Sequence, residues 1–288
     1  MHPIDLNPHG RLRLAIAQRV ANAHRGIDDA SLMAVVSGST VEGLADERSD
    51  VDMSVVFAAL PAEAVLRGAC RHVGGEWLWT IGALAEGGMV VAFQVAGGIE
   101  VQIAYNSHTQ LNADLDQVLV DHNPDTPNHK LAEGMLKALP LAGEPQLAAL
   151  KLRLAAFPPA LGRAMVLHGL ATPTPWRAIA QIIHRDAELW CREIQVDACY
   201  RLLMILCGLN QRYFTRFQVK RMRRLAAQLR VAPPALPHRI EALLAAPPHD
   251  AFTLLHTLDG EVLDLVTRHL PDIDLGVARQ RRSAFTSA

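Results

Sequence analysis

The sequence predicts an α+β protein: an N-terminal α/β half with a mixed sheet, followed by an all-helical bundle. Two observations lead to this prediction. Short apolar runs rich in β-branched residues alternate with helical patterns as far as about residue 105. From about residue 111 those runs vanish, and Ala, Leu, Arg and Gln dominate in segments punctuated by prolines. We place the boundary between Pro140 and Pro145, which gives expected domains 1–140 and 141–288.

The first half contains patterns of both periods. Its expected elements, in chain order, are a helix over 12–24, a buried strand at 32–37 stopped by Gly38, a short helix within 38–48, a strand at 51–57, a helix opened by Pro61 that runs to 73, and strands at 89–95 and 99–105. Proline is tolerated in the first helical turn, where its missing N–H has no partner to lose. The glycine pair Gly97-Gly98 between two alternating runs indicates a hairpin, because primed turns need positive φ.

The second half reads as helices separated by prolines and polar breaks. The expected helices are 111–121, 128–138, 145–155, 159–170, 175–194, 197–214, 216–230, 237–246, 249–256 and 259–269.

Composition narrows the function classes. Half of the 288 residues are hydrophobic and the formal net charge is -1, so the chain lacks the basic excess expected of a general nucleic-acid binder. We expect no membrane span, because no apolar run reaches about 18 residues. Arg11, Arg13 and Arg19 interrupt the first helix, so it is no signal-peptide core, and we expect a cytoplasmic protein. The four cysteines lack metal-binding spacing and are expected to be small buried residues.

One stretch carries residues suited to phosphate and metal chemistry. The strand at 32–37 ends in Gly38-Ser39, where glycine lets backbone N–H groups approach a phosphate and the serine hydroxyl adds a donor. Asp50 and Asp52 follow at the start of the next strand, and the period of two places both carboxylates on one face. Two hard oxygen ligands suit Mg²⁺, which takes one or two carboxylates together with substrate phosphates and water. A solvated strand edge or a turn cap explains Asp50 and Asp52 if they are taken alone.

A third carboxylate is expected on a neighbouring strand. Glu100 is the only acidic residue in either hairpin strand, and it alternates with the apolar residues Ile99 and Val101. It can therefore face the active-site surface, as a third metal ligand or as a base, although an exposed hairpin residue explains it equally.

Gly38-Ser39, then Gly43, then Asp50-Val51-Asp52 on the next strand resembles the signature of the DNA polymerase β-like nucleotidyltransferase superfamily. Within it, the similarity is greatest to small-substrate adenylyltransferases of the aminoglycoside and lincosamide kind, which also place a helical bundle after the catalytic half. The resemblance covers about residues 30–105. It implies a catalytic domain over 1–140 and transfer of a nucleoside monophosphate, with AMP from ATP as the expected case and Mg²⁺ as the metal. Asp50, Asp52 and Glu100 would then be catalytic metal ligands, and Gly38 and Ser39 would hold the phosphates.

The helical half is expected to bind nucleotide or substrate. Its segment 212–230 is rich in Arg and Lys, and we name Asn210, Tyr213 and Lys220 as candidate nucleotide contacts. A solvated helix face explains the same charges. The expected acceptor is a small hydroxylated molecule, antibiotics included, and nucleic acid is not expected. Transfer to a protein or RNA, and a non-catalytic nucleotide-binding module, are the alternatives.

Overall fold

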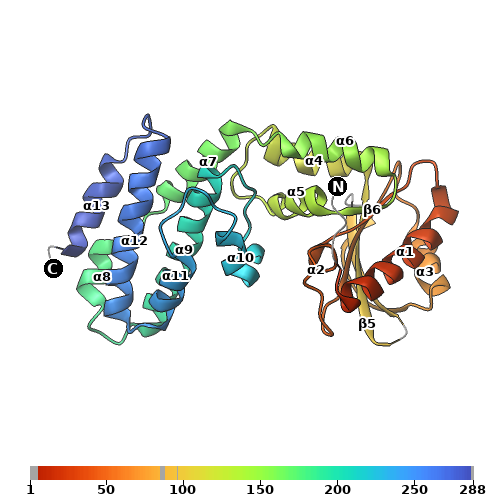
Figure 1. Cartoon of the computed structure of the whole chain (residues 1–288), viewed down its shortest axis with the longest axis horizontal. Coiled ribbons are helices and arrows are strands. Elements are labelled where there is room, and N and C mark those ends of the chain that lie inside the picture. Colours follow the sequence, from red (N-terminus) through yellow and green to blue (C-terminus); the bar gives the residue numbers. More distant parts are fainter. Residues whose placement is uncertain (1–5, 85–87, 96, 287–288) are drawn as a thin grey trace. The chain divides into compact units, whose positions relative to one another are not determined.

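The computed structural model describes residues 6–84, 88–95 and 97–286. The chain forms two compact units, Met1–Gln117 with Leu131–Ala156, and Val118–Lys130 with Phe157–Ala288. The first holds the sheet and the second is helical, so the predicted α+β class is confirmed (Figure 1). The units interleave along the chain, and the division into 1–140 and 141–288 stays a prediction.

A six-stranded mixed sheet forms the centre of the first unit. Its strands are β1 (Met33–Val36), β2 (Val51–Phe57), β3 (Glu76–Ala83), β4 (Gly88–Val95), β5 (Ile99–Ser107) and β6 (Leu139–Ala142). They lie in the order β3-β4-β5-β2-β1-β6. Only β2 and β5 pair in parallel, and the other neighbours are antiparallel. The chain therefore enters β2 and β5 from the same edge, which brings the beginnings of these two strands together.

One face of the sheet is covered by α1 (Pro8–Asp28) and α3 (Glu63–His72). Alternate residues of β2 and β5 enter this core, including Val51, Met53 and Val101. The residues between them, Asp52 and Gln102, belong to the opposite face and are half-buried. Period-two alternation thus separates the apolar core from the polar residues of the candidate site.

The remaining helices lie between strands in the chain or after the last strand. They are α2 (Gly38–Val41), α4 (His108–Leu119), α5 (Asn128–Lys137), α6 (Glu144–Ala155), α7 (Pro159–Ala171), α8 (Trp176–Ile182), α9 (Glu188–Leu209), the 3-10 helix η2 (Arg216–Arg221), α10 (Met222–Ala226), α11 (Leu236–Ala245), α12 (Pro248–His269) and α13 (Gly276–Thr286). Within the second unit α9 packs against α7, α11 and α12, and its residues from Ala198 to Gly208 are mostly buried. None of the described helices has the length and apolarity needed to cross a membrane.

Several boundaries differ from the predicted ones. The predicted helices 175–194 and 197–214 are in fact α8 and α9, with the break at the exposed polar residues His184 to Asp186. The predicted helices 249–256 and 259–269 are one continuous helix, α12. Gly260 lies in its interior, where a Cβ would meet Nη2 of Arg282 at 2.6 Å, so the glycine there makes room for the arginine and does not end the helix. Strands β3 and β6 and helix α13 were not predicted. The four cysteines are free and buried, as expected.

Candidate functional site

Gly38 and Asp52 are packed against each other at the start of the candidate site. Gly38 has a φ of 63°, which an L side chain adopts only with strain. A Cβ on residue 38 would lie 2.0 Å from Oδ2 of Asp52, so the carboxylate occupies the space that any side chain here would need. The backbone N–H of Ser37 also donates to the carbonyl of Asp52, at 2.9 Å. The position of the loop after β1 therefore depends on the position of the Asp52 carboxylate on β2.

Two hydroxyl groups beside Gly38 lack partners. Oγ of Ser39 and Oγ1 of Thr40 are buried, and neither makes a hydrogen bond. A buried polar atom without a partner costs about 1–3 kcal/mol, so such atoms are uncommon and need an explanation. A phosphate oxygen that enters the loop would satisfy Ser39 after rotation of its side chain.

Helix α1 and its N-cap residue bind the 45–49 part of the loop between β1 and β2. Arg13 is buried, and its guanidinium donates to the carbonyls of Ser49 at 2.7 Å, Glu47 at 3.1 Å and His9 at 3.2 Å. Asn7 caps α1 through Gly10 and donates to the carbonyl of Ala45 at 2.8 Å. A guanidinium that bonds only to backbone carbonyls adds positive charge beneath the loop while fixing its path.

A tight turn delivers the chain to Asp50. The Asp46 carboxylate accepts from the hydroxyl of Ser49 at 2.9 Å and the N–H of Arg48 at 3.0 Å. These hydrogen bonds, that of Ser49 foremost, lower the pKa of Asp46. Asp46 is thus an acidic residue of this loop whose carboxylate is engaged by the turn.

The strand register relates the predicted carboxylates. Asp52 is the register partner of Gln102 in the parallel β2–β5 pair, and one position earlier come Val51 and Val101. Asp50 and Glu100 come immediately before the first paired residues, Val51 and Val101. Glu100 accepts a hydrogen bond from Nε2 of Gln102 at 2.9 Å. The start of β5 thus offers a carboxylate and an amide beside the two aspartates.

Asp50 and Asp52 as metal ligands stay a prediction. Among residues 6–84, 88–95 and 97–286, no three His, Cys, Asp or Glu side chains form a group that could hold a metal ion. Asp50 and Asp52 supply the one or two carboxylates that Mg²⁺ takes, with phosphate oxygens and water as its other ligands. The hydroxyl of Ser39, which is buried without a partner, is the donor predicted to contact such a phosphate. Glu100 as a third ligand stays a prediction and requires its side chain to turn from Gln102.

A half-buried cation bonds to Glu42, the residue that follows α2. Nζ of Lys137 contacts Oε1 of Glu42 at 2.9 Å and Oε1 of Glu133 at 2.7 Å. Burial works to lower the pKa of Lys137, but the two carboxylate hydrogen bonds outweigh it and the pKa is raised. Lys137 therefore stays charged and ties α5 to the residue that ends α2.

The predicted nucleotide contacts of the helical half lie in the second unit. The Asn210 amide donates to the carbonyls of Leu206 and Val231 and accepts from the N–H groups of Arg230 and Val231, so both its ends are engaged by backbone. The Tyr213 ring is buried against Phe157 and His129. Lys220 is exposed, with Nζ 5.7 Å from the centre of the Phe217 ring. Asn210 and Tyr213 have structural roles, and nucleotide contact by any of the three stays a prediction.

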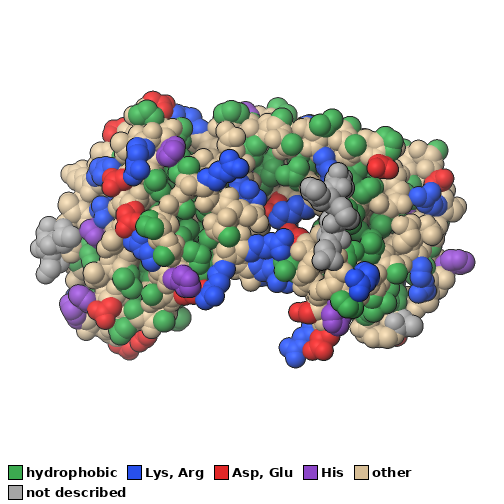
Figure 2. Space-filling view, in the orientation of Figure 1, with side chains coloured by type: hydrophobic (Ala, Val, Ile, Leu, Met, Phe, Trp, Pro, Cys, Tyr) green, Lys and Arg blue, Asp and Glu red, His purple; other side chains and the backbone are tan. Residues whose placement is uncertain are grey.

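The segment 212–230 that contains Lys220 is rich in arginine. Figure 2 shows Lys and Arg side chains grouped over the part of the second unit where η2 and α10 lie. Arg223 and Glu241 form a pair at 2.7 Å, and Arg216 contacts Asp197 at 3.2 Å, so part of this charge is neutralised within the unit.

Sequence reasoning did not single out Arg13, Gln102 or Lys137. A signal for Arg13 exists: it shares a helical face with Ile16, Ala17 and Val20, and an arginine on an apolar face is expected to have a specific partner. Gln102 and Lys137 follow no such pattern, because their roles depend on strand register and on a contact 95 residues away in sequence.

No family model matches this chain, and no curated protein matches it. Among solved structures, it is similar to a nucleotidyltransferase-like protein from Exiguobacterium sibiricum, with 14% identity, a TM-score of 0.36, and coverage of 86% of this chain and 76% of that one. It is also similar to a CCA-adding enzyme in complex with CTP, with 14% identity, a TM-score of 0.33 and coverage of 98% and 71%. The Thermotoga maritima CCA-adding enzyme with tRNA matches at 14% identity, a TM-score of 0.30 and coverage of 98% and 71%. Structural similarities this weak do not decide the function of this chain.

Proposed function

We propose that the chain is a metal-dependent nucleotidyltransferase whose active site is the Gly38 loop and the starts of β2 and β5. The observation that supports this most directly is the packing of Asp52 on Gly38, beside the unpartnered hydroxyl of Ser39. A carboxylate, a glycine with positive φ and an unpartnered hydroxyl at one turn suit a nucleoside triphosphate and its metal.

Each residue then has a separate role. Gly38 and Ser39 bind the β- and γ-phosphates through backbone N–H groups and the serine hydroxyl. Asp50 and Asp52 hold Mg²⁺, which supplies positive charge next to the phosphates and the attacked phosphorus. Glu100 accepts the proton of the attacking hydroxyl in this proposal, and the hydrogen bond that Gln102 donates to its carboxylate supports a defined orientation before the acceptor arrives. Arg13 keeps the loop before Asp50 in place and does not touch the reacting atoms.

The proposed acceptor group is a hydroxyl, and we consider two classes of acceptor molecule. A small hydroxylated molecule, antibiotics included, is the class that the sequence favours, and ATP is the expected donor. RNA is the second class, because basic side chains gather over η2 and α10. The overall net charge of only -1 argues against RNA, and the experiment below tests the expectation that nucleic acid is not a partner.

The test uses nucleotides labelled at the α-phosphate, with Mg²⁺ or Mn²⁺. Acceptor panels contain aminoglycosides, lincosamides, other hydroxylated metabolites and total tRNA. The double variant Asp50→Asn/Asp52→Asn removes the proposed metal ligands. Glu47→Gln is the matched control, because it removes a carboxylate of the same loop whose side chain is 79% exposed. We expect labelled acceptor from the wild type and from Glu47→Gln, and none from the double variant.

Nucleotide binding is measured in parallel by equilibrium dialysis, so that a missing acceptor does not end the test. Metal-dependent binding that the double variant loses supports the active site even without a product. Label on tRNA that decreases steeply with salt identifies the RNA class. The proposal fails if the wild type binds no nucleotide in the presence of metal, or if the double variant binds and transfers as well as the wild type.

A further inference from the structure

The second unit contains a pocket of about 590 Å³. All of its lining residues belong to that unit, from the 124–127 segment, α7, the 172–175 segment, α9 and the 214–217 segment. The volume is that of a site for a small organic molecule. None of the residues proposed for nucleotidyl transfer lines it.

A buried arginine reaches this pocket with part of its guanidinium unused. The side chain of Arg201 is 9% exposed and lines the pocket. Both of its side-chain contacts go through Nη2, to Oδ1 of Asp259 at 2.6 Å and to Oγ1 of Thr174 at 2.9 Å. Its Nε is buried and has no hydrogen-bond partner. Because Thr174 accepts from Arg201, its own hydroxyl proton remains available to a second acceptor in the pocket.

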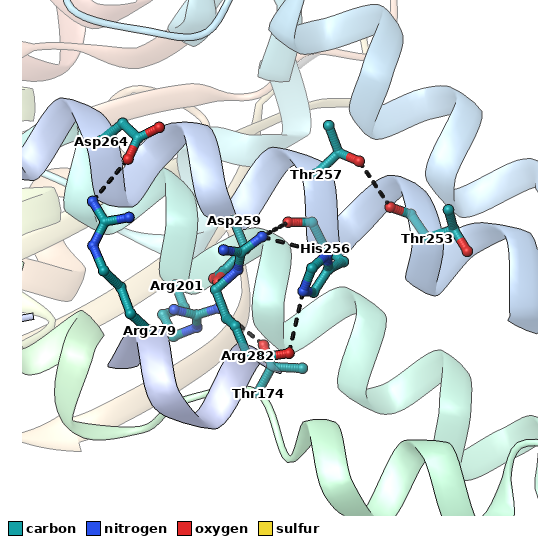
Figure 3. Close-up of polar contacts among 9 residues, drawn as sticks. All are labelled: Thr174, Arg201, Thr253, His256, Thr257, Asp259, Asp264, Arg279 and Arg282. Atoms are coloured by element: carbon teal, nitrogen blue, oxygen red, sulfur yellow. Dashed lines mark hydrogen bonds and ion pairs between the residues drawn. The ribbon is translucent and has the colours of Figure 1, made fainter. Parts of the chain in front are cut away.

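The cluster around Arg201 carries an uncompensated positive charge. Figure 3 shows Arg201 and Arg282 converging on Asp259, whose side chain is 4% exposed. Nε of Arg282 lies 3.2 Å from Oδ2 of Asp259, and its Nη2 donates to the carbonyl of His256 at 2.7 Å. Two guanidinium groups share one carboxylate, so the cluster has a net charge of +1. Buried charge without a counter-ion is costly, which favours an anion at its accessible side.

The pocket also contains one acidic residue outside the Arg216–Asp197 pair, Asp125, whose exposed carboxylate lies 3.9 Å from Nε2 of His168, and its remaining wall is partly apolar. Arg216 pairs with Asp197 at 3.2 Å and its guanidinium lies 4.7 Å from the centre of the Tyr200 ring. Tyr200, Met204 and Phe217 line the pocket and offer ring and thioether surface to a ligand. Arg201 is thus the cationic side chain of the pocket that still has a hydrogen-bond donor without a partner.

We propose that this pocket binds a small organic anion, a carboxylate or phosphate monoester carried on an apolar ring. The guanidinium of Arg201 and the hydroxyl of Thr174 hold the oxyanion, which neutralises the excess charge shared with Arg282. The ring packs on Tyr200, Met204 and Phe217. This binding does not depend on nucleotidyl transfer.

The test measures binding of benzoate and phenyl phosphate to the full chain by isothermal titration calorimetry, with benzamide as a probe of equal shape and no charge. We expect the anions to bind and benzamide to bind at least tenfold more weakly. Arg201→Gln should weaken anion binding roughly 10- to 100-fold, the range for losing a charged hydrogen bond. Benzoate alone, phenyl phosphate alone, or both as ligands support the proposal and identify the oxyanion.

Two further variants test the charge and the wall without altering Arg201. Arg282→Gln removes the excess charge but lines no part of the pocket, and it should lower anion affinity while sparing benzamide. Tyr200→Ala should weaken both kinds of probe. Asp52→Asn should leave binding unchanged, so failure of the proposed transferase function is distinguishable from failure here. Absence of saturable anion binding, equal affinity for benzamide, or anion affinity that survives Arg201→Gln and Arg282→Gln overturns the proposal.

Discussion

Replacing Gly38 by alanine tests whether the loop and Asp52 act as one unit. The substitution imposes two separate costs. Alanine at a φ of 63° costs about 1–2 kcal/mol, because its Cβ approaches the backbone in the left-handed region. Its Cβ would also lie 2.0 Å from Oδ2 and 3.0 Å from Cγ of Asp52, so the carboxylate has to move. Turning Asp52 off its rotamer adds about 1 kcal/mol.

Gly74→Ala separates these two costs. Gly74 has a φ of 77°, in the same region, but a Cβ there would meet nothing within 4 Å. It therefore carries the backbone strain without the collision. We expect the melting temperature to fall by about 2–4 °C for each kcal/mol, so that the two variants differ by only a few degrees.

Nucleotide binding should separate them much further. If Asp52 holds the metal beside the phosphates, its displacement should weaken metal-dependent ATP binding about 10- to 100-fold, as loss of support around a metal site does. Gly74→Ala should bind ATP within a factor of about two of the wild type, since no ligand is moved. The measurement is equilibrium dialysis with Mn²⁺, at a temperature where melting curves show both variants folded. Equal ATP affinities of the two variants would refute the coupling between Gly38 and Asp52.

Three more predictions follow from buried polar groups. Arg13→Lys should lower the melting temperature and the ATP affinity, because an ammonium cannot reach three carbonyls at once. Arg19→Lys loses a single part-buried hydrogen bond to the carbonyl of Val73, at 3.2 Å, and should change neither by much; melting curves and equilibrium dialysis measure both. Asp259→Asn should reduce the free energy of unfolding by roughly 3–5 kcal/mol in urea titrations, because two guanidinium groups lose their shared carboxylate, and an unchanged urea midpoint would contradict the buried cluster. Burial lowers the pKa of His24 below its ordinary 6.5, so the folded state binds fewer protons than the unfolded state. The contribution of His24 to the free energy of unfolding is therefore complete above about pH 6.5. Below that pH it decreases by up to about 1.4 kcal/mol per pH unit. His24→Gln should flatten that dependence in unfolding titrations between pH 5 and 7, and an unaltered slope would show that other groups cause it.

Local patterns predicted the sheet of the first unit well where the residues alternate. β2 begins and ends where its alternation predicts, and the hairpin of β4 and β5 follows from its glycine pair. β3 was missed because its side chains are largely exposed and give no apolar run, although Trp77 and Trp79 alternate within it. β6 was missed because it is a four-residue strand containing Pro140, which pairs with β1 over a sequence distance of about 100 residues.

The site could be predicted to the level of residue types but not of contacts. Spacing placed Asp50, Asp52 and Ser39 near one another, since each follows from a strand end or a strand start. It did not reveal that Asp52 fills the space above Gly38, because this close approach depends on the antiparallel register of β1 and β2. The glycine therefore has a role beyond exposing N–H groups to a phosphate: it makes room for the carboxylate itself.

The parallel pairing of β2 and β5 explains why Asp52 and Glu100 belong to strands that start at the same edge of the sheet. In an antiparallel pair the start of β2 would lie beside the end of β5, about seven strand positions from Glu100. The parallel pair instead sets Gln102 opposite Asp52 and Val101 opposite Val51, so Asp50 and Glu100 each come one residue before a paired position. The crossover needed for parallel pairing is supplied by α3 and the β3–β4 hairpin, which precede β5 in the chain. The segment that separates Asp52 from Glu100 in sequence is thus what allows their strands to begin together.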